Sequence, residues 1–102
     1  MIAMQMQWTG ITPALYDQVR GLVNWEGNHP KGGLFHVAFF DENGLIVHDV
    51  WENAADFQAF ADNRLMPVIQ QLGITSHPDV KVLPVHALFT PGFVSKAELE
   101  TA

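Results

Sequence analysis

A histidine and an aspartate that could form an acid–base pair stand on either side of a tight turn in the sequence. His36 lies in the apolar run GGLFHVAFF and Asp49 in the run LIVHDVWE, with DENG between them. A carboxylate that accepts a hydrogen bond from one imidazole nitrogen fixes the tautomer of the ring and raises the basicity of the other nitrogen. These two candidate catalytic residues could deprotonate a phenol or an activated C–H group, whose anion could then react with oxygen or cyclise.

The two runs must form a hairpin for this pair to meet. Asn43-Gly44 between alternating hydrophobic residues is the strongest short-range signal for a β-hairpin. A two-residue loop at Asn43-Gly44 would pair His36 with Trp51. A four-residue loop from Asp41 would pair His36 with Asp49.

Both of these registers place the same side chains together. His36, Asp49 and Trp51 would share one face of the sheet, with Val47 beside them, because side chains on a strand alternate between faces. An odd-length loop with a bulge would instead place His36 beside His48. On the face shared with His36 and Asp49, Trp51 could stack on an aromatic ligand, or it could simply be a core residue.

The apolar pattern of the strands predicts which sheet face the helices cover. A face packed under helices should be the drier one, so we expect it to carry Met4, Met6, Trp8, Phe35, Val37 and Phe39. The helix-free face would then carry the polar trio and four other candidate substrate-binding residues: Phe40, Val47, Gln5 and Gln7. His86, on the predicted last strand, is a further candidate substrate-binding residue, and the pattern does not assign its face. The glutamines could orient a ligand through hydrogen bonds or bond across a dimer.

Strand and helix signals alternate along the first half of the chain. Alternation predicts a strand from Ile2 to Trp8. Thr12 followed by Pro13 is typical of a helix start, and the helical spacing of apolar residues then runs to about Asn24. Three glycines and a proline indicate a loop over residues 25–33.

The second half repeats the pattern after the hairpin. Asn53, with an acidic residue three positions later, predicts a helix start, and Gly73 is a natural end. Pro67 lies inside this helix and predicts a kink or break near residues 63–66. A last strand is expected over Val80–Phe89, where Pro84 indicates an edge or a bulge.

The resulting order is β-α-β-β-α-β with both helices on one face of a four-stranded antiparallel sheet. This is a ferredoxin-like α+β arrangement. With 102 residues, the sequence fits one domain, which we place at residues 1–90 with a C-terminal tail at 91–102.

Composition excludes several classes of function. The net charge is −6 and the five basic residues form no cluster, so nucleic-acid binding is not expected. There is no cysteine, which excludes disulfides and thiolate chemistry. The N-terminal MIAMQMQW lacks a basic region and no apolar run approaches the length of a membrane span, so we expect a soluble, cytoplasmic protein. His48 and His86 lack the spacing of a metal site with His36, and neither a metal nor another cofactor is expected.

The helix-free face predicts a homodimer. Its plan area is about 300 Å² for four strands of about five residues. Two such faces would bury about 600 Å² and gain roughly 15 kcal/mol at most, against an association cost of about 4–15 kcal/mol. Self-association through this face is therefore energetically feasible.

The segment Val50-Trp51-Glu52-Asn53, followed by Ala55, Phe57 and Phe60, resembles the dimeric α/β-barrel superfamily. The most similar groups are the antibiotic-biosynthesis-monooxygenase-like and stress-responsive barrel proteins. The resemblance implies two ferredoxin-like sheets packed face to face, with a ligand cavity between sheet and helices and Trp51 as a cavity residue. Haem-degrading members carry a histidine on the second helix, where this chain has Phe60 and Ala61, and this departure argues against haem degradation.

Two hypotheses of different classes follow. In the first, the chain is a homodimeric barrel that binds a small apolar or aromatic molecule and acts as a cofactor-independent monooxygenase or cyclase on an aromatic, polyketide-like substrate. In the second, it is a non-enzymatic dimeric module in which His36, Asp49 and Trp51 only fix the interface. Loss of Trp51 would then weaken the dimer without changing ligand uptake.

Overall fold

The structure is a computed structural model that describes residues 1–93. Its elements follow the predicted order: β1 (Ile2–Thr9), α1 (Pro13–Val23), β2 (Gly33–Asp41), β3 (Gly44–Trp51), α2 (Ala54–Phe60), the π-helix η1 (Ala61–Leu65), α3 (Met66–Gln71) and β4 (Asp79–Pro84). The four strands form one antiparallel sheet in the order β2-β3-β1-β4. This confirms the ferredoxin-like α+β fold.

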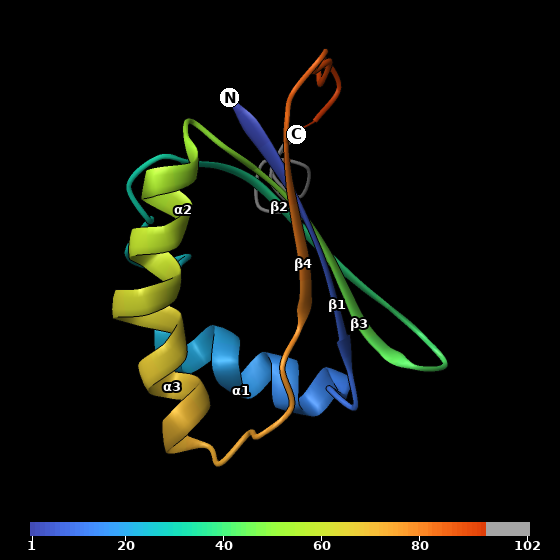
Figure 1. Ribbon diagram of the computed structural model, residues 1–102, viewed down its shortest axis with the longest axis vertical. Helices are drawn as coiled ribbons and strands as arrows, with labels where there is room; N and C mark the ends of the chain where they lie inside the picture. Colours follow the sequence, from blue (N-terminus) through green and yellow to red (C-terminus); the bar gives the residue numbers. More distant parts are fainter. Residues whose placement is uncertain (94–102) are drawn as a thin grey trace, which may run out of the picture.

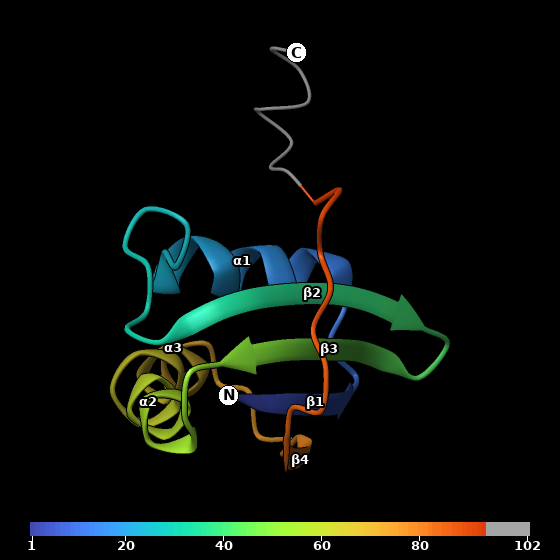
Figure 2. The ribbon, with the colours of Figure 1, turned by 90° about the horizontal axis from the view of Figure 1, so that it is seen from above.

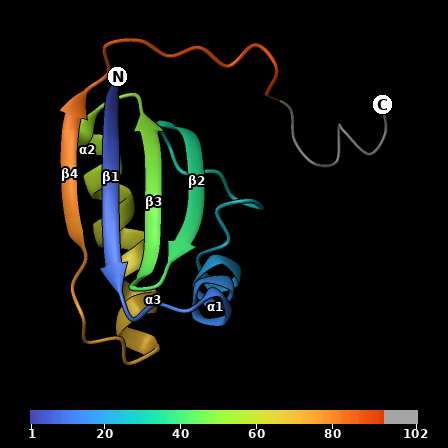
Figure 3. The same cartoon turned by 90° about the vertical axis from the view of Figure 1, so that its right-hand side faces the viewer.

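All helices lie on one side of the sheet (Figure 1). Seen from the open side, α2 and α3 run behind β1 and β3, whereas α1 lies at the β2 edge (Figure 3). The buried core forms between these layers from residues of the sheet and of both helical segments. No helix within residues 1–93 is long and apolar enough to cross a membrane.

Helix α1 begins and ends at the residues that the sequence indicated. The Thr12 hydroxyl accepts a hydrogen bond of 3.2 Å from the backbone N–H of Leu15, and Pro13 occupies the first turn, where no N–H donor is required. Asn24 ends the helix in the left-handed region, with φ 58°. These caps fix where α1 stops and therefore where the loop toward β2 starts.

The second helical segment is interrupted as predicted. Asn53 caps α2 by accepting a hydrogen bond of 2.8 Å from the backbone N–H of Asp56. Pro67 has no N–H to donate to the preceding turn, and the chain forms the π-helix η1 just before it. Arg64 of η1 donates to the Val23 carbonyl at 3.0 Å, which ties this segment to the end of α1.

The hairpin turn differs by one residue from the predicted turn. Asp41 pairs with Gly44, so the turn residues are Glu42 and Asn43 rather than Asn43-Gly44. Gly44 has φ 145°, and a Cβ atom there would collide with the carbonyl oxygen of Trp8. The register is that of the four-residue-loop alternative.

The predicted face is correct for β1, whose Met4, Met6 and Trp8 lie in the core under the helices, and wrong for the β2–β3 hairpin. Met4 pairs with Asp49, which pairs with His36, so these side chains share a face, and it is the face that the helices cover. Phe35, Val37 and Phe39 point to the open face instead, where Val37 and Phe39 are exposed. The helices do not pack tightly over the whole sheet but leave a cavity, and a cavity wall tolerates polar residues that a dry interface would not.

The last strand is shorter than predicted and ends at Pro84, not at Phe89. The Val85 N–H bonds to the Met1 carbonyl at 3.1 Å, and the chain then crosses the end of the sheet toward β2 (Figures 2 and 3). There the ring of Phe93 lies 5.4 Å from that of Phe35. Most of the predicted tail, residues 94–102, lies outside the described residues.

Candidate functional site

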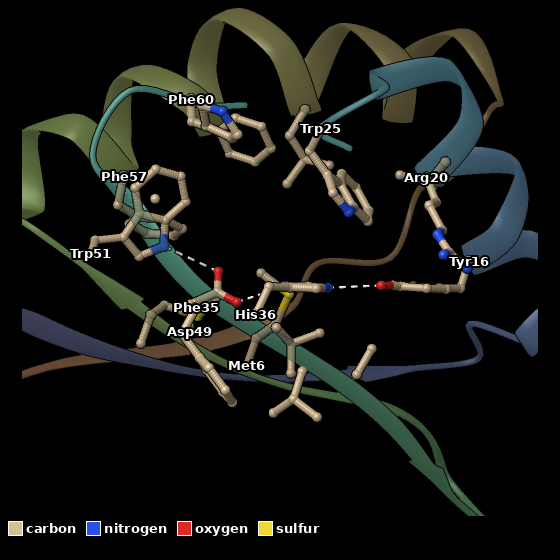
Figure 4. A pocket seen from close by; sticks show the side chains of 18 of the residues that line it. Met6, Tyr16, Arg20, Trp25, Phe35, His36, Asp49, Trp51, Phe57 and Phe60 are labelled. Carbon is tan, nitrogen blue, oxygen red and sulfur yellow. Dashed lines mark hydrogen bonds and ion pairs between the residues drawn. The ribbon is translucent and has the colours of Figure 1, made fainter. Parts of the chain in front are cut away.

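A cavity of about 650 Å³ lies between the sheet and the helices. This volume falls in the range of small-molecule binding sites. Most of its wall is apolar or aromatic, with a few polar groups (Figure 4). The side chains that matter for its chemistry are Tyr16, Trp25, His36, Asp49, Trp51, Phe57 and Phe60.

His36, Asp49 and Trp51 form a hydrogen-bonded chain along one wall of this cavity. His36 Nδ1 lies 2.6 Å from Asp49 Oδ1, and Trp51 Nε1 donates to Asp49 Oδ2 at 3.1 Å. The Asp49 side chain is 8% exposed and that of His36 34%. The carboxylate is thus buried with a donor on each oxygen, while the imidazole reaches the open cavity.

Tyr16 of α1 extends this chain. Its hydroxyl lies 2.7 Å from His36 Nε2. An ionised carboxylate can only accept hydrogen bonds, so His36 Nδ1 carries the proton, and in the neutral ring Nε2 is left as an acceptor. Tyr16 therefore donates its hydroxyl hydrogen to His36. Burial, which disfavours the phenolate, raises the pKa of Tyr16 to about 12.

Two aromatic groups line opposite ends of the cavity in Figure 4. Trp25, from the loop after α1, lies with its ring 5.2 Å from His36 and 5.9 Å from Tyr16. At the other end the Trp51 ring lies 5.6 Å from Phe57 and 5.4 Å from Phe60. Flat apolar walls of this kind favour a planar ligand.

A charged pair lies on the helix α1 side of the cavity. Arg20 holds both carboxylate oxygens of Glu26 through its Nε and Nη2 atoms. This hydrogen-bonded pairing raises the pKa of Arg20 and lowers that of Glu26, so both remain charged near neutral pH. Both side chains line the cavity but are largely exposed, which places the pair where the cavity meets solvent.

The structure separates the predicted site residues into two groups. Val47 lines the cavity beside the trio, as expected. Phe40 shares the face but contacts the edge of the Tyr16 ring and does not line the cavity. Gln5 and Gln7 lie on the helix-free face, as predicted, because they pair with residues 48 and 46. The trio lies on the covered face instead, so the expectation that these glutamines share its face is wrong.

His86 is also separated from the trio. It follows the end of β4, is exposed and lines no part of the cavity. Its placement on a strand depended on β4 continuing to residue 89, whereas the strand ends at Pro84. Within residues 1–93, no group of three histidine, cysteine or acidic side chains could hold a metal ion.

Tyr16 and Trp25 are among the cavity residues that sequence reasoning missed. Tyr16 lies between Leu15 and Asp17 on α1, and nothing local indicates that the helix turns it toward β2. Trp25 begins a loop read only as a connection, although a large aromatic residue in a glycine-rich loop is a signal that could have been used. Both reach the site through tertiary packing of α1 on β2.

Comparison with protein-family models and with curated proteins finds no match to the sequence. Solved structures do match. A protein of unknown function from Nitrosomonas europaea superposes with a TM-score of 0.68 at 18% identity, over 90% of this chain and 95% of that chain.

Two further matches have named activities. A mutant of SnoaB, a cofactor-independent oxygenase from Streptomyces nogalater, matches with a TM-score of 0.61 at 15% identity, over 87% of this chain and 95% of its own. The ActVA-Orf6 monooxygenase from Streptomyces coelicolor, in complex with nanaomycin D, gives 0.58 and 15%, over 89% and 91%. The resemblance to the antibiotic-biosynthesis-monooxygenase fold is therefore confirmed in structure, and at these identities the likeness concerns the fold alone.

Proposed function

We propose that this protein binds a small planar hydroxyaromatic or anthrone-like molecule in the cavity and deprotonates it, as a cofactor-independent monooxygenase. The observation that carries the proposal is the hydrogen-bonded pair of His36 and Asp49 in the wall of an otherwise apolar cavity. Asp49 holds the imidazole in one tautomer and stabilises the imidazolium that forms when His36 takes up a proton.

The chemistry needs no group beyond the substrate and dioxygen. After a proton leaves an anthrone, the carbanion passes electrons to dioxygen and forms a carbon–oxygen bond, giving a peroxide. Loss of water from the peroxide then yields the quinone. One oxygen atom enters the product, the other leaves as water, and the substrate is the reductant throughout.

The apolar walls contribute by excluding water from the reacting anion. In a low-dielectric site the ion pair between a substrate anion and the His36 imidazolium is stronger than in water. The aromatic rings of Trp25 and Trp51 can hold a flat substrate against the base. The activity of SnoaB and the aromatic ligand of ActVA-Orf6 are consistent with this use of the fold.

Cyclisation of a polyketide-like substrate is the neighbouring reaction that the same base could start. It would consume the carbanion in an intramolecular bond instead of passing electrons to dioxygen. Oxygen uptake therefore distinguishes the two outcomes, whereas substrate ionisation is common to both.

We further propose a homodimer that forms through the open sheet face. Val37, Phe39 and Leu83 project from this face and are 37%, 42% and 56% exposed. A patch of such side chains is typical of a protein interface. This pairing leaves the cavity on the helix side of each subunit free for a ligand.

The test is dioxygen uptake with anthrone as the substrate, followed by identification of the product. We expect protein-dependent uptake and anthraquinone formation, and a loss of about 100-fold or more in His36→Gln, because glutamine cannot accept the proton. His77→Gln is the matched control, since His77 is an exposed histidine outside the cavity. Equal rates in wild type and His36→Gln would contradict the proposal.

A further inference from the structure

We propose that Tyr16 is a catalytic residue that contacts the substrate hydroxyl and relays its proton to His36. This inference rests on the proposed function, since it specifies how the base of that site reaches its substrate. It assigns to α1 a direct part in the chemistry, which would otherwise belong to the β2–β3 hairpin alone.

The first argument is that neither ring nitrogen of His36 is free. Nδ1 is bound to Asp49 at 2.6 Å and Nε2 to the Tyr16 hydroxyl at 2.7 Å. An imidazole has no third nitrogen with which to meet a substrate. A ligand must therefore displace Tyr16 or be deprotonated through it.

The second argument is that displacement would disturb several contacts. The Tyr16 ring is held by Trp25, with centroids 5.9 Å apart, and by the edge contact with Phe40 at 6.1 Å. Its ring is also nearly parallel to that of His36, with 2° between the two planes and 6.2 Å between the centroids. The phenol is thus aligned end to end with the imidazole by its packing as well as by its hydrogen bond.

The third argument is that the Tyr16 hydroxyl can accept a hydrogen bond from a ligand. Tyr16 lines the cavity, and a phenol oxygen that donates one hydrogen bond can still accept another. Its donated hydrogen goes to His36, so the acceptor position is open to a ligand O–H. The raised pKa of about 12 keeps this phenol neutral at working pH, as a relay group must be before the reaction.

The proton transfers balance without another group. The substrate O–H bond breaks and its proton bonds to the Tyr16 oxygen, while the Tyr16 hydrogen moves to His36 Nε2. The products are a substrate oxyanion, a neutral tyrosine and an imidazolium paired with Asp49. Tyr16 then donates a hydrogen bond to the oxyanion and stabilises it. The charged groups that act on the pKa of Tyr16 are Arg20, which lowers it, and Glu26, Asp49 and Asp17, which raise it.

The experiment uses para-nitrophenol, whose neutral and anionic forms absorb at different wavelengths. In complex with wild type we expect the anion spectrum at a pH about one unit below that at which the free probe ionises. Tyr16→Phe keeps the ring and removes the hydroxyl, so we expect it to bind the probe in the neutral form. Ionisation by Tyr16→Phe equal to that by wild type would overturn the relay while leaving the base function intact.

The outcomes separate the two proposals. If wild type bound the probe without ionising it, the proposed function would fail, and the relay with it. If wild type ionised the probe and Tyr16→Phe did not, the relay would be supported. His77→Gln is the control and should ionise the probe as wild type does.

A second measurement uses the wild-type sequence and needs no substitution. Tyr16 is the single tyrosine of the sequence, so biosynthetic incorporation of meta-fluorotyrosine labels this position alone. We expect the fluorine NMR resonance to shift when para-nitrophenol is added and the shift to saturate with probe binding. An unchanged resonance at saturation would overturn the contact between Tyr16 and the ligand.

Discussion

The indole of Trp51 donates a hydrogen bond through Nε1 to Oδ2 of Asp49, the residue two positions earlier on the same face of β3. The distance is 3.1 Å and both residues are buried. The bond leaves the other carboxylate oxygen to His36. Trp51 thus orients the carboxylate that orients the base, in addition to forming part of the cavity wall.

Trp51→Phe tests this relationship. The variant keeps an aromatic ring against Phe57 and Phe60 but leaves Asp49 Oδ2 without its donor. We expect the free energy of unfolding to fall by about 1–3 kcal/mol, measured by chemical denaturation. In the background of Asp49→Leu, where the acceptor is gone, the same change should cost less, and an equal cost in both backgrounds would show that the hydrogen bond contributes nothing.

The single tyrosine makes the pKa of Tyr16 directly measurable. Tyrosinate absorbance should titrate with a pKa of about 12 instead of the ordinary 10.0. Below pH 10 the phenol is neutral in both folded and unfolded chains, so the ionisation of Tyr16 does not change the free energy of unfolding there. As the pH rises from 10 toward 12, the unfolded chain loses the proton first, and the folded state should lose stability. Ionisation near pH 10 in the folded protein would contradict the burial of this group.

The hairpin turn depends on a glycine that a side chain cannot replace. Gly44→Ala should destabilise the fold by about 1–3 kcal/mol, because φ is 145° and the new Cβ would meet the Trp8 carbonyl. Gly21→Ala is the contrasting control, since Gly21 lies within α1 with open space around it. There alanine should stabilise by about 0.5–1 kcal/mol. Thermal unfolding measures both effects, and we expect the melting temperature to fall in Gly44→Ala and to rise in Gly21→Ala.

The proposed dimer predicts that a lysine at one exposed apolar position weakens the dimer, whereas a lysine at another does not. Phe39→Lys places a charge on the open face and should shift the protein toward monomer in native mass spectrometry. Leu22→Lys changes a residue of similar exposure on α1 and should leave the dimer intact. A wild type that is monomeric at every concentration tested would remove the dimer from the proposal.

Local sequence patterns were sufficient for the elements and for part of the site. Helix caps such as Thr12 and Asn53 and the break before Pro67 are short-range features, and all three are found in the structure. The period-two alternation of strands was also enough to place His36, Asp49 and Trp51 on one face, because both even-length loops that were considered give that result.

Which face of the β2–β3 hairpin the helices cover was not predictable in this way, although the covered face of β1 was. The rule that the driest side chains lie under helices assumes a tightly packed interface, but here the helices enclose a cavity, and the open face carries Phe35, Val37 and Phe39. Tyr16 was missed for a related reason. Its contact with His36 spans 20 positions and depends on how α1 packs against β2, which no local pattern records.

The most direct test of the central claim is the absorption spectrum of para-nitrophenol bound to wild type and to His36→Gln. We predict the anion spectrum in the wild-type complex at a pH where the free probe is neutral, and the neutral spectrum in the His36→Gln complex. Anion formation in both complexes would show that His36 is not the proton acceptor. A neutral spectrum in both would show that the cavity does not perform the proposed deprotonation.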